Sequence, residues 1–231
     1  MSAKIGLVEV FAAPQGEGYH SGRWAVFIRL AGCPLACEFS PGVVCDTPYM
    51  EAKEKVTLKE LFGDFVLPLL PQQPRGVIHT PMIIITGGEP TFCPQFDKIV
   101  EWAKQTHCYT AVETNGMKWC EGLLAINWIC LSPKTHVSQT STSHYHNPNP
   151  RSAMMLDRRV RAELTARENR GDVGGEYRYV ISRNDSTPPY YPAFRHYVSP
   201  AVLSSGSGDE WKTGFPGYSS GAVERCLEIV R

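Results

Sequence analysis

Apolar and polar positions along the chain predict strands that alternate with helices. Short apolar runs rich in β-branched residues are typical of strands. Strands are predicted over Lys4–Phe11, Trp24–Leu30, Met82–Thr86, Tyr109–Glu113, Asn127–Leu131, Glu176–Ser182 and Arg195–Val198. Helices are predicted over Thr57–Leu69, Phe96–Gln105, Ala153–Glu168 and Gly221–Arg231. This alternation predicts an α/β fold with a parallel sheet.

Two local patterns sharpen this prediction. Thr57 is followed three residues later by Glu60, which is the capping-box pattern at the start of a helix. Met82–Thr86 is apolar without interruption, as expected of a strand that is buried on both faces. Stretches rich in Ser, Thr, Asn, Gly and Pro, which predict long loops, cover Thr135–Arg151 and Ser204–Ser220.

Composition is consistent with one globular domain over residues 1–231, because 231 residues with 42% hydrophobic content suffice for a single core. The 23 basic and 23 acidic residues balance, which gives no general attraction to nucleic acid or to an anionic membrane. No apolar run reaches membrane-spanning length and the start lacks a secretory segment, so a cytoplasmic protein is expected. Eight cysteines in such a protein indicate metal ligands or core residues more than disulfides.

Three of these cysteines lie in one loop after a predicted strand, in the spacing C-x3-C-x7-C. They are Cys33, Cys37 and Cys45. Three thiolates on a four-iron cluster leave one iron open for a chelating molecule. A zinc site is the alternative, but structural zinc takes four ligands, and the nearest histidine, His20, precedes the strand. Taken alone, the spacing favours the cluster only slightly over zinc or ordinary buried thiols.

A second candidate segment is Thr86-Gly87-Gly88-Glu89-Pro90, which ends a buried strand. Ligands bind at the carboxyl ends of strands in α/β folds, and glycines let backbone approach them closely. A Gly-Gly pair by itself is weak, since most such pairs are turns.

Taken together, the motifs resemble the 7-carboxy-7-deazaguanine synthases, a family of radical S-adenosylmethionine enzymes. Several motifs in one order are more specific than any single one. The matching segments are Gln15–Gly18, Phe27–Pro34, Cys37, Cys45–Thr47, Thr86–Pro90, Glu113–Gly116 and Ser132–Lys134. The resemblance covers roughly residues 5 to 135, with a weaker match through Tyr177–Ser182 and Tyr197–Pro200. It departs at one place, because the family spacing is C-x3-C-x2-C and five extra residues lie within 38–44 here.

The resemblance implies a fold and a reaction. The fold would be an incomplete (β/α) barrel, with insertions near 38–44, 135–151 and 204–220. The reaction would convert 6-carboxy-5,6,7,8-tetrahydropterin to 7-carboxy-7-deazaguanine with loss of ammonia, in 7-deazapurine biosynthesis of the queuosine type. The implied cofactors are a [4Fe-4S] cluster, S-adenosylmethionine and Mg²⁺. The implied partners are an electron donor such as flavodoxin or ferredoxin and a second copy in a homodimer.

Site residues follow from the matching motifs. Cys33, Cys37 and Cys45 would hold the cluster, and Thr47 would bind magnesium. The implied cofactor contacts are Val44, Cys45, Asp46, Gly88, Glu113, Ser132, Pro133 and Lys134. The implied substrate contacts are Pro14, Gln15, Gly16, Glu17, Arg29 and Thr86. For Arg29 there is a physical reason as well, because a guanidinium binds a carboxylate through two charged hydrogen bonds.

Two other functions remain open at this point. One is another radical enzyme, such as a glycyl-radical activase, against which the Gln15–Gly18 and Cys45–Thr47 motifs argue. The other is a zinc-stabilised binding module without radical chemistry. Family members generally finish with a tail that closes the substrate pocket, whereas this sequence stops at Arg231 within a predicted helix. Either the chain is truncated or a loop closes the pocket, and Ser204–Ser220 is the favoured loop.

Overall fold

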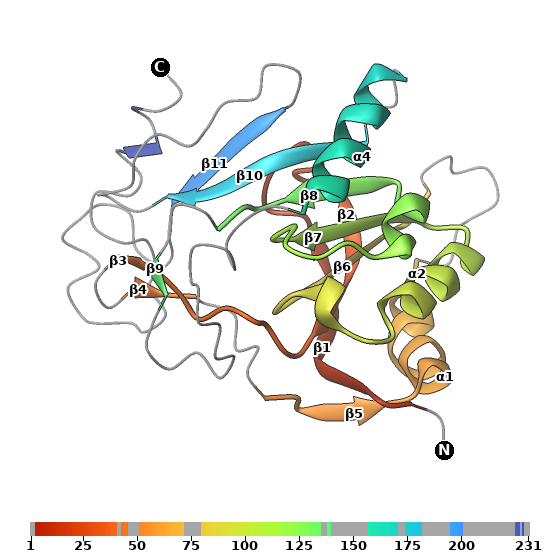
Figure 1. The fold of residues 1–231 in the computed structure, drawn as a ribbon. Helices are drawn as coiled ribbons and strands as arrows, with labels where there is room; N and C mark the ends of the chain where they lie inside the picture. The colour runs from red at the N-terminus through yellow and green to blue at the C-terminus, as the bar shows by residue number, and fades with distance from the viewer. Residues whose placement is uncertain are drawn as a thin grey trace.

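The structure, a computed structural model, describes residues 3–40, 43–45, 51–71, 80–134, 138–139, 157–170, 174–181, 195–200, 225, 226 and 228. Its strands are β1 (Ile5–Pro14), β2 (Trp24–Leu30), β3 (Cys37–Ser40), β4 (Val43–Val44), β5 (Glu54–Val56), β6 (Met82–Gly87), β7 (Tyr109–Thr114), β8 (Trp128–Leu131), β9 (Ser138–Gln139), β10 (Gly175–Ile181) and β11 (His196–Pro200). Its helices are α1 (Leu58–Glu60), α2 (Phe96–Gln105) and α4 (Arg158–Asn169), with helical turns at Leu61–Val66, Leu67–Leu69, Pro90–Phe92 and Glu121–Ala125. Figure 1 shows their arrangement.

Eight strands form one open sheet in the order β11-β10-β8-β7-β6-β2-β1-β5. Six neighbouring strands of this sheet run parallel, as predicted, namely β2, β6, β7, β8, β10 and β11. The prediction is wrong for β1, which pairs antiparallel with both β2 and β5. The physical reason is the short connection from β1 to β2, because a parallel crossover needs a dozen or more residues. The sheet does not close, which fits an incomplete barrel.

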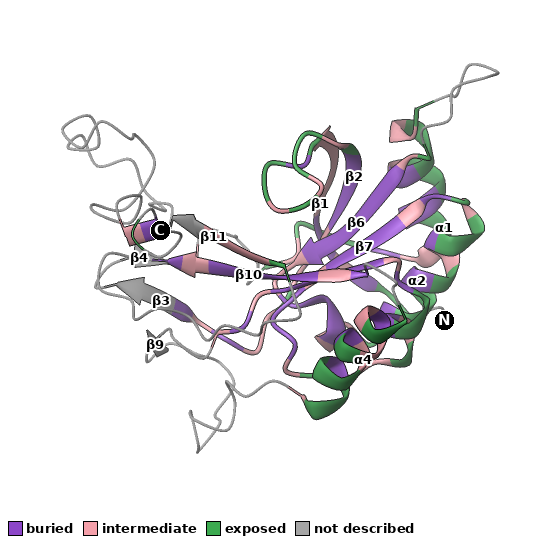
Figure 2. Cartoon of the chain, turned by 90° about the horizontal axis from the view of Figure 1, so that it is seen from above, coloured by how far each residue is buried: buried purple, intermediate pink, exposed green. Residues whose placement is uncertain are grey.

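Helices cover one face of the sheet. In Figure 1, α1, α2 and α4 lie together beside the strands, and Figure 2 shows that they turn their exposed sides to solvent. The main core fills this layer, with Ile28, Ile83, Val112 and Ile129 from the strands packed against Phe62 and Ile99 from the helical segments. The predicted helix over Thr57–Leu69 is helical throughout, with the capping box in place: Glu60 N–H donates to Thr57 Oγ1, and Thr57 N–H donates to Glu60 Oε2.

The opposite face of the sheet is the inner face of the partial barrel. Near the amino ends of the strands, Ala25, Phe27, Met82, Ile84, Ala111 and Trp128 form a second apolar cluster. Further along the same strands the inward positions become polar, as described below. The two clusters alternate along each strand, because successive side chains point to opposite faces.

A second, small sheet lies beside the first, in the order β4-β3-β9. The cysteine segment was predicted as a loop, and that is wrong for β3 and β4, which pair antiparallel. The predicted loop Thr135–Arg151 is likewise wrong at Ser138–Gln139, which pair with β3. The other predicted elements begin or end within a few residues of their predicted bounds, although α4 begins at Arg158, after the N-cap Asp157. The strand β5 and the helical turns Pro90–Phe92 and Glu121–Ala125 were not predicted. Gly221–Arg231 lies outside the described residues except for Arg225, Cys226 and Glu228, which are helical.

Candidate active site

The three cysteines of the predicted cluster come together beyond the end of β2. Cys33 and Cys45 pack against buried Leu35 and Cys37, and Met117 completes this group. The Leu35 N–H donates to Cys33 Sγ over 3.5 Å, and the Cys45 N–H donates to the Cys37 carbonyl over 3.0 Å. The chain therefore leaves Cys37 along β3 and returns along β4, which brings Cys45 back beside Cys37 in spite of the longer spacing.

The three cysteine thiols of this group are a donor set that fits a four-iron cluster. Within the described residues, no group of three or more His, Cys, Asp and Glu side chains is placed to hold one metal ion. A four-iron cluster binds each thiolate on a different iron, so its sulfurs stand further apart than the ligands of one ion. Three cysteines in one contact group fit that demand. Burial raises the pKa of the Cys33 thiol well above its ordinary range, so a bound positive metal centre would be needed to keep it as thiolate.

Glu89 links the two loops that follow β6 and β7. Its side chain is 2% exposed and accepts four hydrogen bonds from protein groups. The donors are Thr91 N–H, Thr91 Oγ1, Thr114 Oγ1 and Asn115 N–H, at 2.6–3.1 Å. Burial raises the pKa of this carboxyl, and the four hydrogen bonds oppose that rise. Since Glu89 N–H also donates to the Gly32 carbonyl, the residue is tied to the cysteine segment as well.

Gly87 explains how β6 can approach β2 so closely. It adopts φ +129°, and a Cβ atom there would overlap the backbone of Leu30. Gly88 N–H then donates to the Leu30 carbonyl over 3.0 Å. Glycine at 87 therefore places the predicted ligand-binding segment directly beside the start of the cysteine segment.

A row of polar residues crosses the inner face of the sheet. Arg29 on β2 pairs in register with Thr86 on β6, Glu113 on β7 pairs with Cys130 on β8, and Cys130 pairs with Glu176 on β10. Thr86 and Glu113 are joined by a hydrogen bond from Thr86 Oγ1 to Glu113 Oε2 at 2.8 Å. Three residues predicted from separate motifs therefore lie in one line with two that were not predicted. We call this line the polar row, and its members are Arg29, Thr86, Glu113, Cys130 and Glu176.

Glu113 is the centre of the polar row. Its Oε1 accepts hydrogen bonds from Gln15 Nε2 at 3.0 Å and from Arg178 Nη1 at 2.8 Å. Burial opposes ionisation of Glu113, but the Arg178 charge and the hydrogen bonds hold the pKa below its usual range. A carboxylate can accept about four hydrogen bonds. Three of these positions on Glu113 are filled by Gln15, Arg178 and Thr86. The group is thus ionised and retains capacity for a cationic ligand.

Arg178 and Glu176 are site residues that the motifs did not single out. Arg178 lies on β10, with 8% of its side chain exposed, and it contacts Glu113, Glu17 and Glu176. Its Nη2 donates to Glu176 Oε1 at 2.6 Å, and the Glu176 side chain is fully buried. The signal available in the sequence was a charged residue, Arg178, between Tyr177 and Tyr179 in a predicted strand. Its partners Glu113 and Glu17 lie far away along the chain, so the sequence does not show the contacts.

Arg29 is held by a neighbouring strand. Its Nε donates to Glu9 Oε1 at 2.9 Å, and its guanidinium carbon lies 5.6 Å from the centre of the Phe11 ring. The side chain is 23% exposed, so it remains accessible from the inner face. Glu9 therefore fixes the orientation of the residue predicted to meet a substrate carboxylate.

The remaining predicted residues are placed as follows. Pro14 ends β1, Gly16 and Glu17 are exposed in the segment 15–23, and Gln15 is buried. Ser132, Pro133 and Lys134 follow β8, where Lys134 Nζ donates to Ser132 Oγ at 2.6 Å. Val44 belongs to β4, its side chain lying outside the described residues. Asp46, Thr47 and the Ser204–Ser220 loop also lie outside them.

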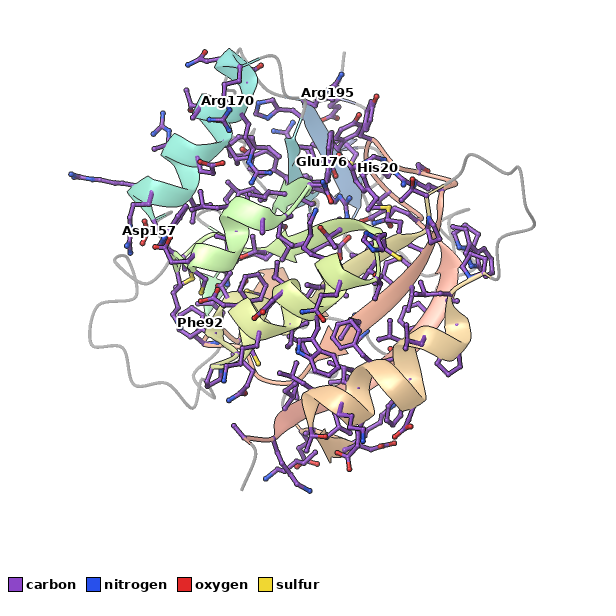
Figure 3. The ribbon with its side chains drawn as sticks, turned by 90° about the vertical axis from the view of Figure 1, so that its right-hand side faces the viewer. His20, Phe92, Asp157, Arg170, Glu176 and Arg195 are labelled. Atoms are coloured by element: carbon purple, nitrogen blue, oxygen red, sulfur yellow. The ribbon has the colours of Figure 1, made fainter. Side chains whose placement is uncertain are left out.

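A small cavity of about 10 Å³ lies below the polar row, between Gln15, Glu113, Trp128, Glu176 and Arg178. His20 lines it, and its ring makes edge contacts with Tyr109 and Trp128 at 5.2 and 4.6 Å. Figure 3 shows His20 close to Glu176, with Arg195 nearby. The His20 Nε2 atom is buried and finds no hydrogen-bond partner among the described residues. Burial, with the charges of Arg23 and Arg178, lowers the pKa of His20 to about 4.

This depressed pKa predicts a stability change with pH. Between about pH 6.5 and pH 4 the unfolded chain binds a proton at His20 that the folded chain does not, so the free energy of unfolding falls as pH falls. Because the ring is only half-buried, solvent screening reduces the expected loss to about 1–2 kcal/mol. Urea unfolding at pH 7 and pH 4.5 should show this loss, and His20→Gln should diminish it. An equal loss in the two proteins would contradict the assignment.

The five other cysteines lie apart from the three-cysteine group. Cys108, Cys130 and Cys226 are buried, while Cys93 and Cys120 are half-buried. The latter two line a groove of about 300 Å³ with Lys118 and Trp119.

Among the described residues, none of the helices combines the length and the apolar character that a membrane span requires.

Comparisons with known proteins agree with the motifs. The chain is 35% identical over 129 residues to the 7-carboxy-7-deazaguanine synthase of Haemophilus influenzae, which is 56% of this chain and 53% of that protein. It is also 35% identical over 129 residues to the synthase of Bacteroides thetaiotaomicron, covering 60% of that protein. The chain is thus similar to 7-carboxy-7-deazaguanine synthases over somewhat more than half of its own length. It spans about half the length of these relatives, and no protein-family profile matches it.

The fold has a counterpart among solved structures. QueE from Escherichia coli superposes with a TM-score of 0.53 and 20% identity, over 78% of this chain and 72% of that one. At this identity the likeness concerns the fold alone. It agrees with the prediction of an incomplete barrel, since the mixed sheet of eight strands is open in this chain.

Proposed function

We propose that this chain is a 7-carboxy-7-deazaguanine synthase. It would convert 6-carboxy-5,6,7,8-tetrahydropterin to 7-carboxy-7-deazaguanine with loss of ammonia. The observation that carries the proposal is the pair of hydrogen bonds by which Gln15 and Thr86, from two separate motifs, both donate to Glu113 from a third. The half-length similarity to named synthases supports the same reading.

In this proposal, Cys33, Cys37 and Cys45 hold a [4Fe-4S] cluster. When bound, the cluster would supply the one-electron chemistry that lets S-adenosylmethionine act on the substrate as a radical reagent. The protein's own part is to place the two molecules and to exclude water. The buried contacts of Leu35 and Met117 around the cysteines keep that surrounding apolar.

The cofactor would lie against Glu113, Gly88 and the Ser132–Lys134 segment, with Val44, Cys45 and Asp46 beside the cluster. Glu113 is kept ionised by Arg178 and therefore suits the ammonium group of S-adenosylmethionine. Lys134 provides a cation for the cofactor carboxylate. These groups follow β6, β7 and β8, and the carboxyl ends of parallel strands are the usual position for ligands in α/β folds.

The pterin would lie against Pro14, Gln15, Gly16, Glu17, Arg29 and Thr86. Amide and hydroxyl groups such as Gln15 and Thr86 can both donate and accept, which suits the edge of a pterin ring. Thr47 would contribute an oxygen to Mg²⁺, which takes hard oxygen ligands and keeps several waters. A flavodoxin or ferredoxin as electron donor and a homodimer complete the proposal, together with a place in queuosine-type biosynthesis in the cytoplasm.

Anaerobic incubation with the carboxy-tetrahydropterin, S-adenosylmethionine, Mg²⁺ and a chemical reductant tests this function. Mass spectrometry should detect 7-carboxy-7-deazaguanine and ammonia release. A brown protein that cleaves S-adenosylmethionine but leaves the pterin unchanged would indicate a different radical enzyme. A colourless protein that retains zinc after anaerobic reconstitution would indicate a zinc-stabilised module.

Arg29 offers a test of the substrate assignment. Arg29→Lys keeps the charge but loses the two-armed geometry, so substrate binding should weaken by about 1–3 kcal/mol. Titration calorimetry with the pterin measures this loss, and S-adenosylmethionine should bind with unchanged affinity. Arg159→Lys is the control, since Arg159 is exposed on α4 and lies outside the site. Equal losses for both ligands in Arg29→Lys would show a role in folding instead.

A further inference from the structure

Arg178 joins three segments that are distant in the sequence. From β10 it donates to Glu113 Oε1 on β7 through Nη1 and to the Glu17 carbonyl through Nη2, at 2.8 and 3.3 Å. Its Nη1 also lies 3.5 Å from Glu17 Oε2. Glu176, two residues earlier on the same strand, accepts from Nη2 and thereby fixes the guanidinium.

The same pair of residues anchors the segment 15–23, which connects β1 to β2. Tyr19 N–H donates to Glu176 Oε2 at 2.8 Å. Gly18 adopts φ +72°, and a Cβ atom there would collide with both the Glu176 carboxylate and the Arg178 guanidinium. The segment therefore packs directly on the Arg178–Glu176 pair, and Glu17, Gly18 and Tyr19 take their positions from it.

Glu113 brings the two halves of the site into contact. Its Oε1 accepts from Arg178 and from Gln15, which begins the anchored segment. In the proposed function, Gln15 and Glu17 face the pterin and Glu113 faces the cofactor. A movement of the 15–23 segment would therefore change the hydrogen bonds of Glu113, and a ligand on Glu113 would constrain the segment.

We propose that Arg178, fixed by Glu176, is a positioning residue that couples pterin binding to S-adenosylmethionine binding by holding the 15–23 segment against Glu113. This inference rests on the proposed function for the identity of the two ligands. The arrangement suits such coupling because a guanidinium presents several donors in a fixed fork, which a lysine ammonium does not reproduce. In this arrangement one guanidinium contacts three carboxylates, those of Glu17, Glu113 and Glu176.

The first test needs no ligand. Hydrogen exchange of the reconstituted protein should show at least tenfold faster exchange over residues 15–23 in Arg178→Lys and in Glu176→Gln than in the unaltered protein. Arg167→Lys is the matched control, because Arg167 is 6% exposed and equally well bonded, to Glu163 and to the carbonyls of Leu123 and Ile126 on the helical side. It should leave the exchange of residues 15–23 unchanged. Unchanged exchange in both site variants overturns the inference, whatever the ligands are.

The second test measures the coupling itself. Titration calorimetry gives the affinity for S-adenosylmethionine with and without saturating carboxy-tetrahydropterin. Coupling between two sites typically amounts to 5- to 150-fold. We expect a factor in that range for the unaltered protein and for Arg167→Lys, and a factor near one for Arg178→Lys and Glu176→Gln. A factor near one in the unaltered protein, or an undiminished one in both site variants, overturns the inference. Failure of the unaltered protein to bind the pterin counts against the proposed function instead, and the exchange experiment then decides the role of Arg178.

Discussion

A protein in which Cys45 is replaced by alanine is expected to lose its cluster and, with it, all cleavage of S-adenosylmethionine. With three cysteines the reconstituted protein should hold about four irons per chain, and two thiolates do not suffice to retain such a cluster. The same loss is expected for Cys33→Ala and Cys37→Ala. Iron and sulfide analysis, the visible spectrum and the yield of 5′-deoxyadenosine measure it.

Cys93→Ala and Cys120→Ala are the controls, because these two half-buried cysteines line the groove beside α2 and do not belong to the Cys33, Cys37 and Cys45 group. Both should keep the full iron content and activity. Cys45 is the most informative position, since it follows the extra residues between the second and third cysteines. A full, active cluster in Cys45→Ala would falsify its assignment as the third ligand.

Glu89→Ala should cause the largest loss of stability among the residues that lie near the site without being assigned to a ligand. The substitution leaves Thr91 N–H, Asn115 N–H and two threonine hydroxyls without their acceptor in a buried position. Each buried donor without a partner costs about 1–3 kcal/mol. Because some donors regain water, we expect the free energy of unfolding to fall by about 3–5 kcal/mol. Urea unfolding followed by circular dichroism measures it.

Glu89→Gln separates hydrogen bonding from charge, because the amide oxygen still accepts from some of these donors. It should cost less than Glu89→Ala, by at least about 1 kcal/mol. Glu121→Ala is a surface control, since Glu121 accepts from Trp119 Nε1 at an exposed position, and it should change stability by less than about 0.5 kcal/mol. If Glu89→Ala were as mild as that control, Glu89 could not be the link between the two loops.

Much of the fold was predictable because local patterns decide it. The capping box at Thr57 and the apolar run at Met82 are both found as expected, since a cap and a buried strand depend on neighbours in the sequence. The direction of β1 was not predictable from such patterns, because an apolar strand looks the same in either direction. Only the length of its connection to β2 pointed to an antiparallel pair, and the alternation of strands and helices elsewhere concealed that signal.

The candidate site was likewise predictable from sequence only in part. Motif residues such as Gln15, Thr86 and Glu113 were named from sequence, and their meeting around one carboxylate is explained by the sheet that carries them. Arg178 was missed because its contacts depend on partners 65 and 161 residues away. Isolated charged residues in strands are common, and nothing local distinguishes one that binds three carboxylates. The magnesium assignment of Thr47 stays a prediction, as that residue lies outside the described ranges.

The polar row has a consequence for how such a site can diversify. Its members sit on neighbouring hydrogen-bonded strands from β2 to β10, so backbone pairing fixes their spacing at about 4.8 Å per strand and roughly 19 Å in all. Substituting one side chain of the row changes the functional group at that strand and leaves the backbone positions of the others unchanged. The pairing of the strands thus keeps the spacing of these side chains constant, so a substitution at one position changes the local chemistry without moving the other members of the row.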